Sequence, residues 1–154
     1  MSESEQLCTF SIGEYRCALP VQSVLEVLAQ QQLAPVPLAP PVVAGLLNLR
    51  GQILTVLDLR RIIIDPTESL APEPMTIVLD RQGQPVALLV DAIGDVLRCE
   101  RDQLLESPET IDPRLREVTM AIIHQEDVIT LVLDPVAIIH VGEDLSRSFV
   151  VGCA

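Results

Sequence analysis

Residues 45–60 read G-L-L-N-L-R-G-Q-I-L-T-V-L-D-L-R, and they say more about the fold than any other part of the chain. Arg50 is the one cation between Gly45 and Asp58 in this apolar run, and Gly51 follows it directly. Arginine is seldom buried without a partner. Arg50 is therefore expected either at the rim of a recognition surface or as one half of a charged pair.

The same stretch resembles the central motif of the CheW-like chemotaxis coupling proteins, G-x-x-N-L-R-G followed by an apolar strand and Asp-Leu. Three other segments resemble further elements of that family: residues 15–27 its first hairpin and V-x-E-V element, residues 88–97 its V-V-D-x-V-x-D-V element, and residues 128–139 its closing strand and helix. The matches cover roughly residues 7–141 in the expected order. Four matches in register form a specific signal, although each one alone is weak.

The composition is that of an acidic, folded protein. Apolar residues make up 49% of the 154 positions, aromatic residues make up 2%, and the formal net charge is −12. An acidic surface repels phosphate backbones and anionic lipids, so neither nucleic acid nor direct membrane insertion is expected. No apolar run approaches ~18 residues, and the acidic N-terminus is unlike a secretory signal, so a cytoplasmic location is predicted.

The cysteines and histidines give no sign of a disulfide framework or a metal site. Neither His124 nor His140 has a second His or Cys at ligand spacing. The sequence also contains no nucleophile motif and no glycine-rich phosphate or dinucleotide loop. We therefore expect no catalytic residue, no metal and no cofactor. Four cysteines without C-x-x-C spacing are expected to be reduced, the first three as small apolar residues in or near strands: Cys8, Cys17, Cys99 and Cys153.

The second half of the chain repeats the first. Residues 18–28 align with residues 87–97, with Glu26 opposite Asp95, and residues 53–58 align with residues 129–134. The offset grows between the two alignments, and the polar, proline-bearing stretch 106–116 can hold the difference. In the first alignment five pairs are identical: Ala18/Ala87, Leu19/Leu88, Val21/Val90, Val27/Val96 and Leu28/Leu97.

Each half is predicted to contain two strands, a short helical turn, a strand, a long loop, two strands and a short helix. Short β-branched strands with frequent breaks favour small barrels over a βαβ sheet. The resemblance implies an all-β fold with a few short helices, in which two small five-stranded SH3-like barrels pack together. We expect one domain over residues 7–141, with halves at about 7–64 and 75–141. Strands can be exchanged between the halves, and the tail 142–154 either docks on the body or serves a partner.

Two positions depart from the family pattern in the second half. Ala121 stands where the family usually has glycine, and the hairpin at Gln125-Glu126-Asp127 contains no glycine. A tight two-residue turn favours glycine or asparagine, so this hairpin is expected to need a different geometry.

Asp58 and Asp134 end equivalent strands of the two halves. Each precedes an apolar helical pattern, and Pro135 follows Asp134, which is typical of an N-cap with proline at the first helical position. We interpret both aspartates as structural caps. The alternative is an acid and base pair that works with His124 in a small all-β enzyme or ligand-binding barrel, and it requires the three side chains to share one cleft.

The resemblance places a partner-binding surface around Arg50. Its matching positions in the family include a charged pair, so Arg50 and Glu26 are predicted to meet at about 3 Å on the rim of an apolar groove. For the branched apolar positions plain core is an open alternative, because core and groove demand the same residue types. The positions matching the receptor-binding groove are Val24, Glu26, Gly45, Leu46, Asn48, Arg50 and Val90.

The resemblance implies a non-catalytic adaptor. Such a protein links the cytoplasmic tip of chemoreceptors to the regulatory domain of a histidine kinase, itself CheW-like. An adaptor of a pilus-motility or other non-flagellar chemosensory system is an alternative that shares the fold and the Arg50 motif.

Overall fold

The computed structural model describes residues 4–69 and 71–152, and in these residues strands dominate. In chain order the strands are β1 (Ser4–Ile12), β2 (Tyr15–Pro20), β3 (Val24–Leu28), β4 (Val43–Leu49), β5 (Gln52–Asp58), β6 (Met75–Leu79), β7 (Val86–Val90), β8 (Ala92–Glu100), β9 (Thr119–Gln125) and β10 (Val128–Leu133). The helical elements are η1 (Val21–Ser23), α1 (Leu59–Ile63), η2 (Arg101–Gln103), α2 (Pro113–Val118) and α3 (Pro135–Gly152).

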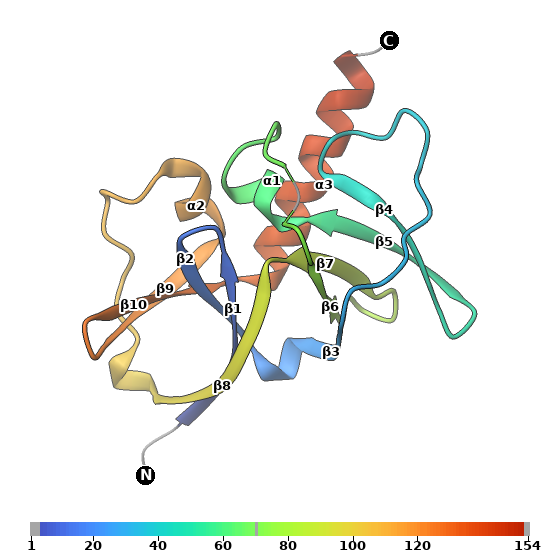
Figure 1. The fold of residues 1–154 in the computed structure, drawn as a ribbon. Helices are drawn as coiled ribbons and strands as arrows, with labels where there is room; N and C mark the ends of the chain where they lie inside the picture. The colour runs from blue at the N-terminus through green and yellow to red at the C-terminus, as the bar shows by residue number, and fades with distance from the viewer. Residues whose placement is uncertain (1–3, 70, 153–154) are drawn as a thin grey trace.

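The strands form two five-stranded sheets, each curled into a small barrel. Barrel A has the strand order β8-β1-β2-β10-β9, and barrel B has the order β3-β6-β7-β5-β4. Figure 1 shows barrel A on the left, barrel B on the right and α3 rising between them. The predicted all-β class with two packed barrels is therefore confirmed.

Each barrel combines strands from both halves of the chain. The first hairpin, β1–β2, joins β8, β9 and β10, whereas the second hairpin, β6–β7, joins β3, β4 and β5. The two parallel strand pairs have equivalent registers, because Val132 lies opposite Ala18 and Val56 lies opposite Ala87. These are the positions that the repeat aligns, so the internal repeat corresponds to a pseudo-symmetric exchange of hairpins.

The largest hydrophobic core lies between the barrels and belongs to both. It contains Leu19 and Leu133 from barrel A, Leu57 and Leu88 from barrel B, and apolar side chains of all three α-helices. Two smaller clusters fill the individual barrels, one around Ile123 in barrel A and one that we call the barrel B core (Leu47, Leu54, Val56, Val78, Ala87 and Leu89). Because a barrel of this size encloses little apolar volume, most of the buried surface depends on the partner barrel.

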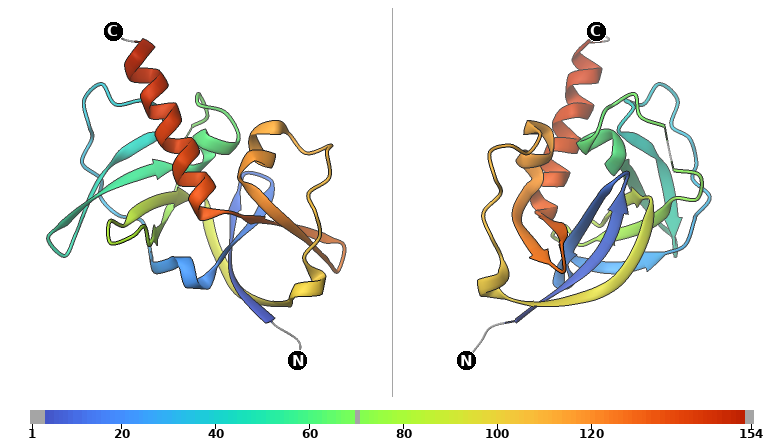
Figure 2. Two further views of the ribbon diagram at one scale, coloured as in Figure 1. Left: turned by 180° about the vertical axis from the view of Figure 1, so that it is seen from behind. Right: turned by 60° about the vertical axis from the view of Figure 1, so that its left-hand side comes forward.

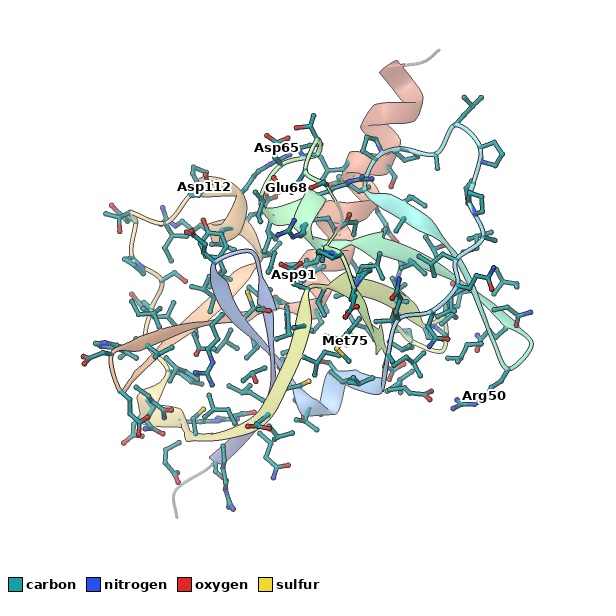
Figure 3. All side chains as sticks on the ribbon, in the orientation of Figure 1. Arg50, Asp65, Glu68, Met75, Asp91 and Asp112 are labelled. Carbon is teal, nitrogen blue, oxygen red and sulfur yellow. The ribbon has the colours of Figure 1, made fainter. Side chains whose placement is uncertain are left out.

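A polar contact at the centre of the molecule also joins the barrels. Asp91 is the single residue between β7 of barrel B and β8 of barrel A, and Figure 3 shows it at the centre of the molecule. Its Oδ2 atom accepts from the backbone N–H of Gly13 at 2.7 Å. Its Oδ1 atom forms an ion pair with Arg60, 2.8 Å from Nε, although the Nε–H of Arg60 is poorly aligned for a hydrogen bond. The contact fixes the crossover between the barrels.

Helix α3 is longer than the short closing helix predicted from the sequence. It continues through residue 152, so most of the predicted tail is helical. Val141 and Leu145 pack against the shared core, which gives the additional turns an apolar face to bury. Figure 2 shows from behind that α3 starts at the seam between the barrels and extends beyond them. Cys153 lies outside the described residues.

Two local predictions for the second half were wrong. No helical turn separates β7 from β8, because Asp91 alone makes the crossover. The hairpin between β9 and β10 also keeps a two-residue turn, with positive φ at both Glu126 (50°) and Asp127 (63°). This is the pattern of a type I′ turn, built here without glycine at the cost of left-handed backbone at two acidic residues.

Candidate functional site

Arg50 occupies the tight turn between β4 and β5. Its φ is +53° and that of Gly51 is +86°, so the two residues form the positive-φ pair of a type I′ hairpin turn. The Oδ1 atom of Asn48 accepts from the backbone N–H of Gly51 at 3.0 Å, which stabilises the turn. Arginine is uncommon at positive φ, whereas asparagine and glycine are several-fold enriched there. The turn would form more readily with another residue, so the guanidinium is held here against a backbone preference.

The Arg50 side chain makes a bidentate ion pair with Glu26 of β3. Nη1 donates to Oε2 at 2.8 Å and Nη2 donates to Oε1 at 2.6 Å, as in the fork geometry of strong arginine–carboxylate pairs. The hydrogen bonds that Arg50 donates, together with its positive charge, lower the pKa of Glu26. The same bonds, together with the negative charge of Glu26, raise the pKa of Arg50. The Arg50 side chain remains 72% exposed and that of Glu26 is 26% exposed. Figure 3 shows Arg50 near the tip of the β4–β5 hairpin, away from barrel A.

The pair lies where barrel B closes on itself. Strands β3 and β4 are the two edges of the barrel B sheet, and the ion pair joins them. A second link is the isolated bridge between Ala34 and Leu46. Leu28 and Leu49, which flank the pair along the two edges, pack against the barrel B core. The pair thus lies between two residues that pack on a hydrophobic cluster, while its cation remains exposed to solvent.

Gly45 and Leu46 contact the loop between β3 and β4, where barrel B closes. A Cβ atom at Gly45, where φ is +155°, would lie 2.8 Å from the carbonyl oxygen of Ala34. The backbone that approaches Gly45 therefore belongs to the loop between β3 and β4 of the same chain. Leu46 is half-buried and exchanges two backbone hydrogen bonds with Ala34.

The two valines differ in exposure. Val90 is 1% exposed and belongs to the shared core, so its expected place in a surface groove was wrong. It ends β7, which lies in the middle of the sheet and is buried along its whole length. Val24 is half-buried and packs against the same core. The structure thus brings Glu26, Asn48 and Arg50 together at the surface and leaves Val90 inside.

The sequence reasoning missed two exposed apolar residues beside Glu26. Leu25 is 56% exposed and Val27 is 39% exposed, and both lie on the outer face of the edge strand β3. The strict alternation of side chains along a strand was the signal, because it places neighbours of the half-buried Glu26 on the opposite face.

A cavity of about 530 Å³ begins two residues beyond Arg50. Its wall includes Gln52, Ile53 and Thr55 of β5, the β6–β7 hairpin, and Ile139 and Glu143 of α3, but neither Arg50 nor Glu26. The ion pair of Arg81 with Glu143 joins the hairpin to α3 at this cavity. This cavity is therefore bordered by β5 of the β4–β5 hairpin and not by the ion pair.

Asp58 and Asp134 are N-caps and do not share a cleft with His124. Asp58 Oδ1 accepts from the N–H of Arg60 at 3.0 Å, and Asp134 Oδ1 accepts from that of Val136 at 3.0 Å. Asp58 is 1% exposed, and burial raises the pKa of its carboxyl. His124 lies opposite Ile129, five residues before Asp134, which places it about 16 Å away along the strand. The proposed acid–base–histidine arrangement is therefore wrong.

The described cysteines are buried thiols. Cys8, Cys17 and Cys99 are free and lie in strands. Burial, together with the nearby charge of Asp91, raises the pKa of the Cys17 thiol to about 12, which makes it unreactive at neutral pH. Within residues 4–69 and 71–152, no group of three His, Cys, Asp or Glu side chains is arranged to hold a metal ion. No helix in this part of the chain is long and apolar enough to span a membrane.

Residues 6–143 match the model of the CheW-like domain, and the chain belongs to this family. It is 25% identical to the chemotaxis protein CheW of Treponema pallidum over 136 residues, which covers 86% of this chain and 80% of that protein. It is 29% identical to protein FrzA of Myxococcus xanthus, covering 69% of this chain and 66% of that protein.

The same fold is found in the crystal structure of the scaffolding protein TtCheW from Thermoanaerobacter tengcongensis. The TM-score is 0.74 at 24% sequence identity, and the superposition covers 86% of each chain. Membership in this family makes the chain a non-catalytic coupling adaptor of the chemotaxis type and not an enzyme.

Proposed function

We propose that this adaptor couples the cytoplasmic tip of chemoreceptors to a histidine kinase, and that the receptor binds around the Arg50–Glu26 pair. The observation that carries the proposal is the exposed, bidentate guanidinium held in an unfavourable turn conformation at the edge of barrel B. Backbone strain concentrates at functional sites, where the surroundings maintain it. A cytoplasmic location follows from the same proposal.

The surface around the pair has the chemistry needed for an amphipathic helical hairpin. Arg50 and Asn48 offer a charge and an amide. Leu25 and Val27 expose apolar side chains on the outer face of β3, the strand that carries Glu26, and Ile53 does so on β5. Helices commonly bind through an apolar stripe that rests on such side chains, with polar contacts at its border. A contact of about 1,000 Å² in total would be weak alone, and its strength would come from many such contacts in an array.

The test is a pull-down from lysate of the source cells, read by mass spectrometry, with wild type and Arg50→Glu. Wild type should recover chemoreceptors and a histidine kinase. Arg50→Glu should lose the receptors, because the reversed charge repels Glu26 and removes the donor group. Arg116→Glu is the matched control, since Arg116 is an exposed arginine on α2 of barrel A. The identity of the recovered receptors also separates flagellar chemotaxis from a pilus-linked pathway.

Equal recovery of receptors by Arg50→Glu and wild type would contradict the proposed site, provided that both proteins melt at similar temperatures. The double variant Glu26→Arg with Arg50→Glu separates the pair from the individual charge. If it restores binding, the closed geometry of the barrel edge is what the receptor needs. If it restores the melting temperature but no binding, the receptor contacts the Arg50 guanidinium itself.

A further inference from the structure

The loop between β3 and β4 is the longest uncharged segment near the proposed receptor site. No charged residue stands between Glu26 and Arg50, although charged residues make up 21% of the chain. Four prolines lie in the loop: Pro35, Pro37, Pro40 and Pro41. Figure 1 shows the loop arching along the side of barrel B that faces away from barrel A.

The position of Leu38 in this loop is unfavourable for leucine for two reasons, its backbone conformation and its exposure to solvent. Its φ is +61°, and the backbone N–H of Ala39 donates to the carbonyl of Val36 at 3.2 Å, so Pro37 and Leu38 are the central residues of a type II turn. The third position of such a turn is occupied by glycine or asparagine in most proteins, and a bulky residue there is an outlier. The side chain is also 95% exposed, so it has almost no packing within the chain to offset the strain.

The turn is held in place from both sides. Ala34 exchanges two backbone hydrogen bonds of 2.9 Å with Leu46 at the start of the loop. At its end, Nη1 of Arg61 donates to the carbonyl of Pro41 at 2.8 Å, and the N–H of Asp58 donates to the carbonyl of Val42 at 2.8 Å. The prolines restrict the backbone between these anchors. A side chain on a preorganised turn loses little conformational entropy on binding.

We propose that Leu38 is an anchor residue that inserts into an uncharged apolar pocket on the histidine kinase. This inference rests on the proposed function. A protein of net charge −12 meets another protein with least electrostatic repulsion through an uncharged segment. A single apolar side chain that fills a pocket can supply much of the energy of a small interface.

The position of Leu38 favours the kinase over the receptor. Arg50 directly follows the last residue of β4, whereas Leu38 precedes the first residue, Val43. The seven-residue strand β4 places Val43 about 23 Å from Arg50, and Leu38 lies in the loop that leads into Val43. Figure 1 shows that the loop enters β4 at the end opposite to the β4–β5 turn, while its first part runs beside β4, where Ala34 pairs with Leu46. A coupling protein needs separate surfaces for partners that it holds simultaneously, and Leu38 provides one that a receptor at Arg50 leaves free.

The test measures binding of the purified full-length kinase and receptor, as identified by the wild-type pull-down, to wild type, Leu38→Asn and Leu38→Met. Asparagine tolerates positive φ, so Leu38→Asn should melt at or above the wild-type temperature. It should weaken kinase binding by about 10- to 100-fold, the loss expected for one buried leucine. Receptor binding should stay unchanged. Leu38→Met keeps an apolar side chain of similar volume and should retain kinase binding within a few-fold.

Unchanged kinase affinity in Leu38→Asn would overturn the anchor, as would an equal loss for kinase and receptor. A lower melting temperature for Leu38→Asn would also overturn it, because that result would assign Leu38 a packing role. If receptor binding requires Arg50 but kinase affinity is unchanged in the Leu38 variants, the proposed function stands and only the role of Leu38 as an anchor is contradicted. If wild type binds no kinase, both proposals fail together.

Discussion

The β4–β5 and β9–β10 hairpins occupy equivalent places in the two barrels but differ in their chemistry. Arg50 and Gly51 form the turn of the first hairpin, and Glu126 and Asp127 form the turn of the second, with positive φ at all four residues. In the first hairpin the turn residue is a cation that pairs with Glu26 of the facing strand. In the second, both turn residues are acids, and the residue that the repeat aligns with Glu26 is Asp95 of β8, also an acid.

This difference separates what the fold requires from what recognition requires. The same backbone turn forms in both barrels, so the turn does not need an arginine. The acids at the equivalent place in barrel A repel one another and cannot form an ion pair like the one that closes barrel B. The duplicated fold therefore carries the proposed receptor site once, and the copy in barrel A retains only the geometry.

The largest expected effect tests whether the barrels are energetically separable. Leu57 and Leu133 are equivalent in the repeat, and both lie in the shared core. Leu57→Ala and Leu133→Ala should each lower the free energy of unfolding by about 2–5 kcal/mol, because each leaves a cavity. Chemical denaturation should show one transition for both barrels in each variant. The exposed Ile53 provides the control, since Ile53→Ala should change stability little. Two resolved transitions would show that the barrels unfold independently.

The next effect concerns the strand in front of each turn. Gly45 is equivalent to Ala121, and the bridge of Ala34 with Leu46 is equivalent to that of Leu105 with Ile122. Gly45→Ala should destabilise the protein by about 1–3 kcal/mol, because the new Cβ would collide with the carbonyl of Ala34.

Ala121→Gly is the matched change in barrel A. It should cost only about 0.5–1 kcal/mol, since it removes a side chain and adds freedom to the unfolded chain. Thermal melting of the two variants checks the order. A smaller effect for Gly45→Ala than for Ala121→Gly would show that the loop of barrel B yields easily.

A smaller effect is expected at the second turn itself. The double variant Glu126→Asn with Asp127→Gly supplies residues that favour positive φ, and should stabilise the protein by about 1 kcal/mol. Differential scanning calorimetry measures this gain. Arg50→Asn relieves strain at one residue only, and it also breaks the ion pair, so its matched change is Glu126→Asn alone, and its gain should be the smaller of the two. Equal gains for Arg50→Asn and Glu126→Asn would mean that the pair adds nothing to stability.

The smallest effect is the pH dependence of the ion pair. Arg50 lowers the pKa of Glu26 below its ordinary value of 4.5. A carboxyl with a lowered pKa in the folded state stabilises the fold above its unfolded pKa, and this contribution disappears as the pH falls through the folded pKa. The contribution of the pair should therefore be lost only below pH 4.5.

An NMR titration should show that the pKa of the Glu26 carboxyl returns toward its ordinary value of 4.5 in Arg50→Gln. An unchanged titration in this variant would mean that the pair does not persist in solution.

Several features could be predicted from the sequence because they depend on nearby residues. Short β-branched runs with frequent breaks predicted the strands, and Asp58 and Asp134 preceded helical patterns as N-caps. The contact of Glu26 with Arg50 was also predicted, but from the family motif, since no local rule links residues that far apart. The burial of Val90 was not predictable, because an apolar residue at the end of a strand suits a groove and a core equally well.

The sequence by itself determined the repeat, the short strands and the family to which the chain belongs. Only the tertiary structure decided that the hairpins exchange between halves, that the backbone approaching Gly45 is the chain's own, and that Leu38 is exposed on a strained turn. The physical reason is that side-chain patterns report local backbone preference and burial. Strand partners and loop positions are instead fixed by hydrogen bonds and packing between residues distant in the chain.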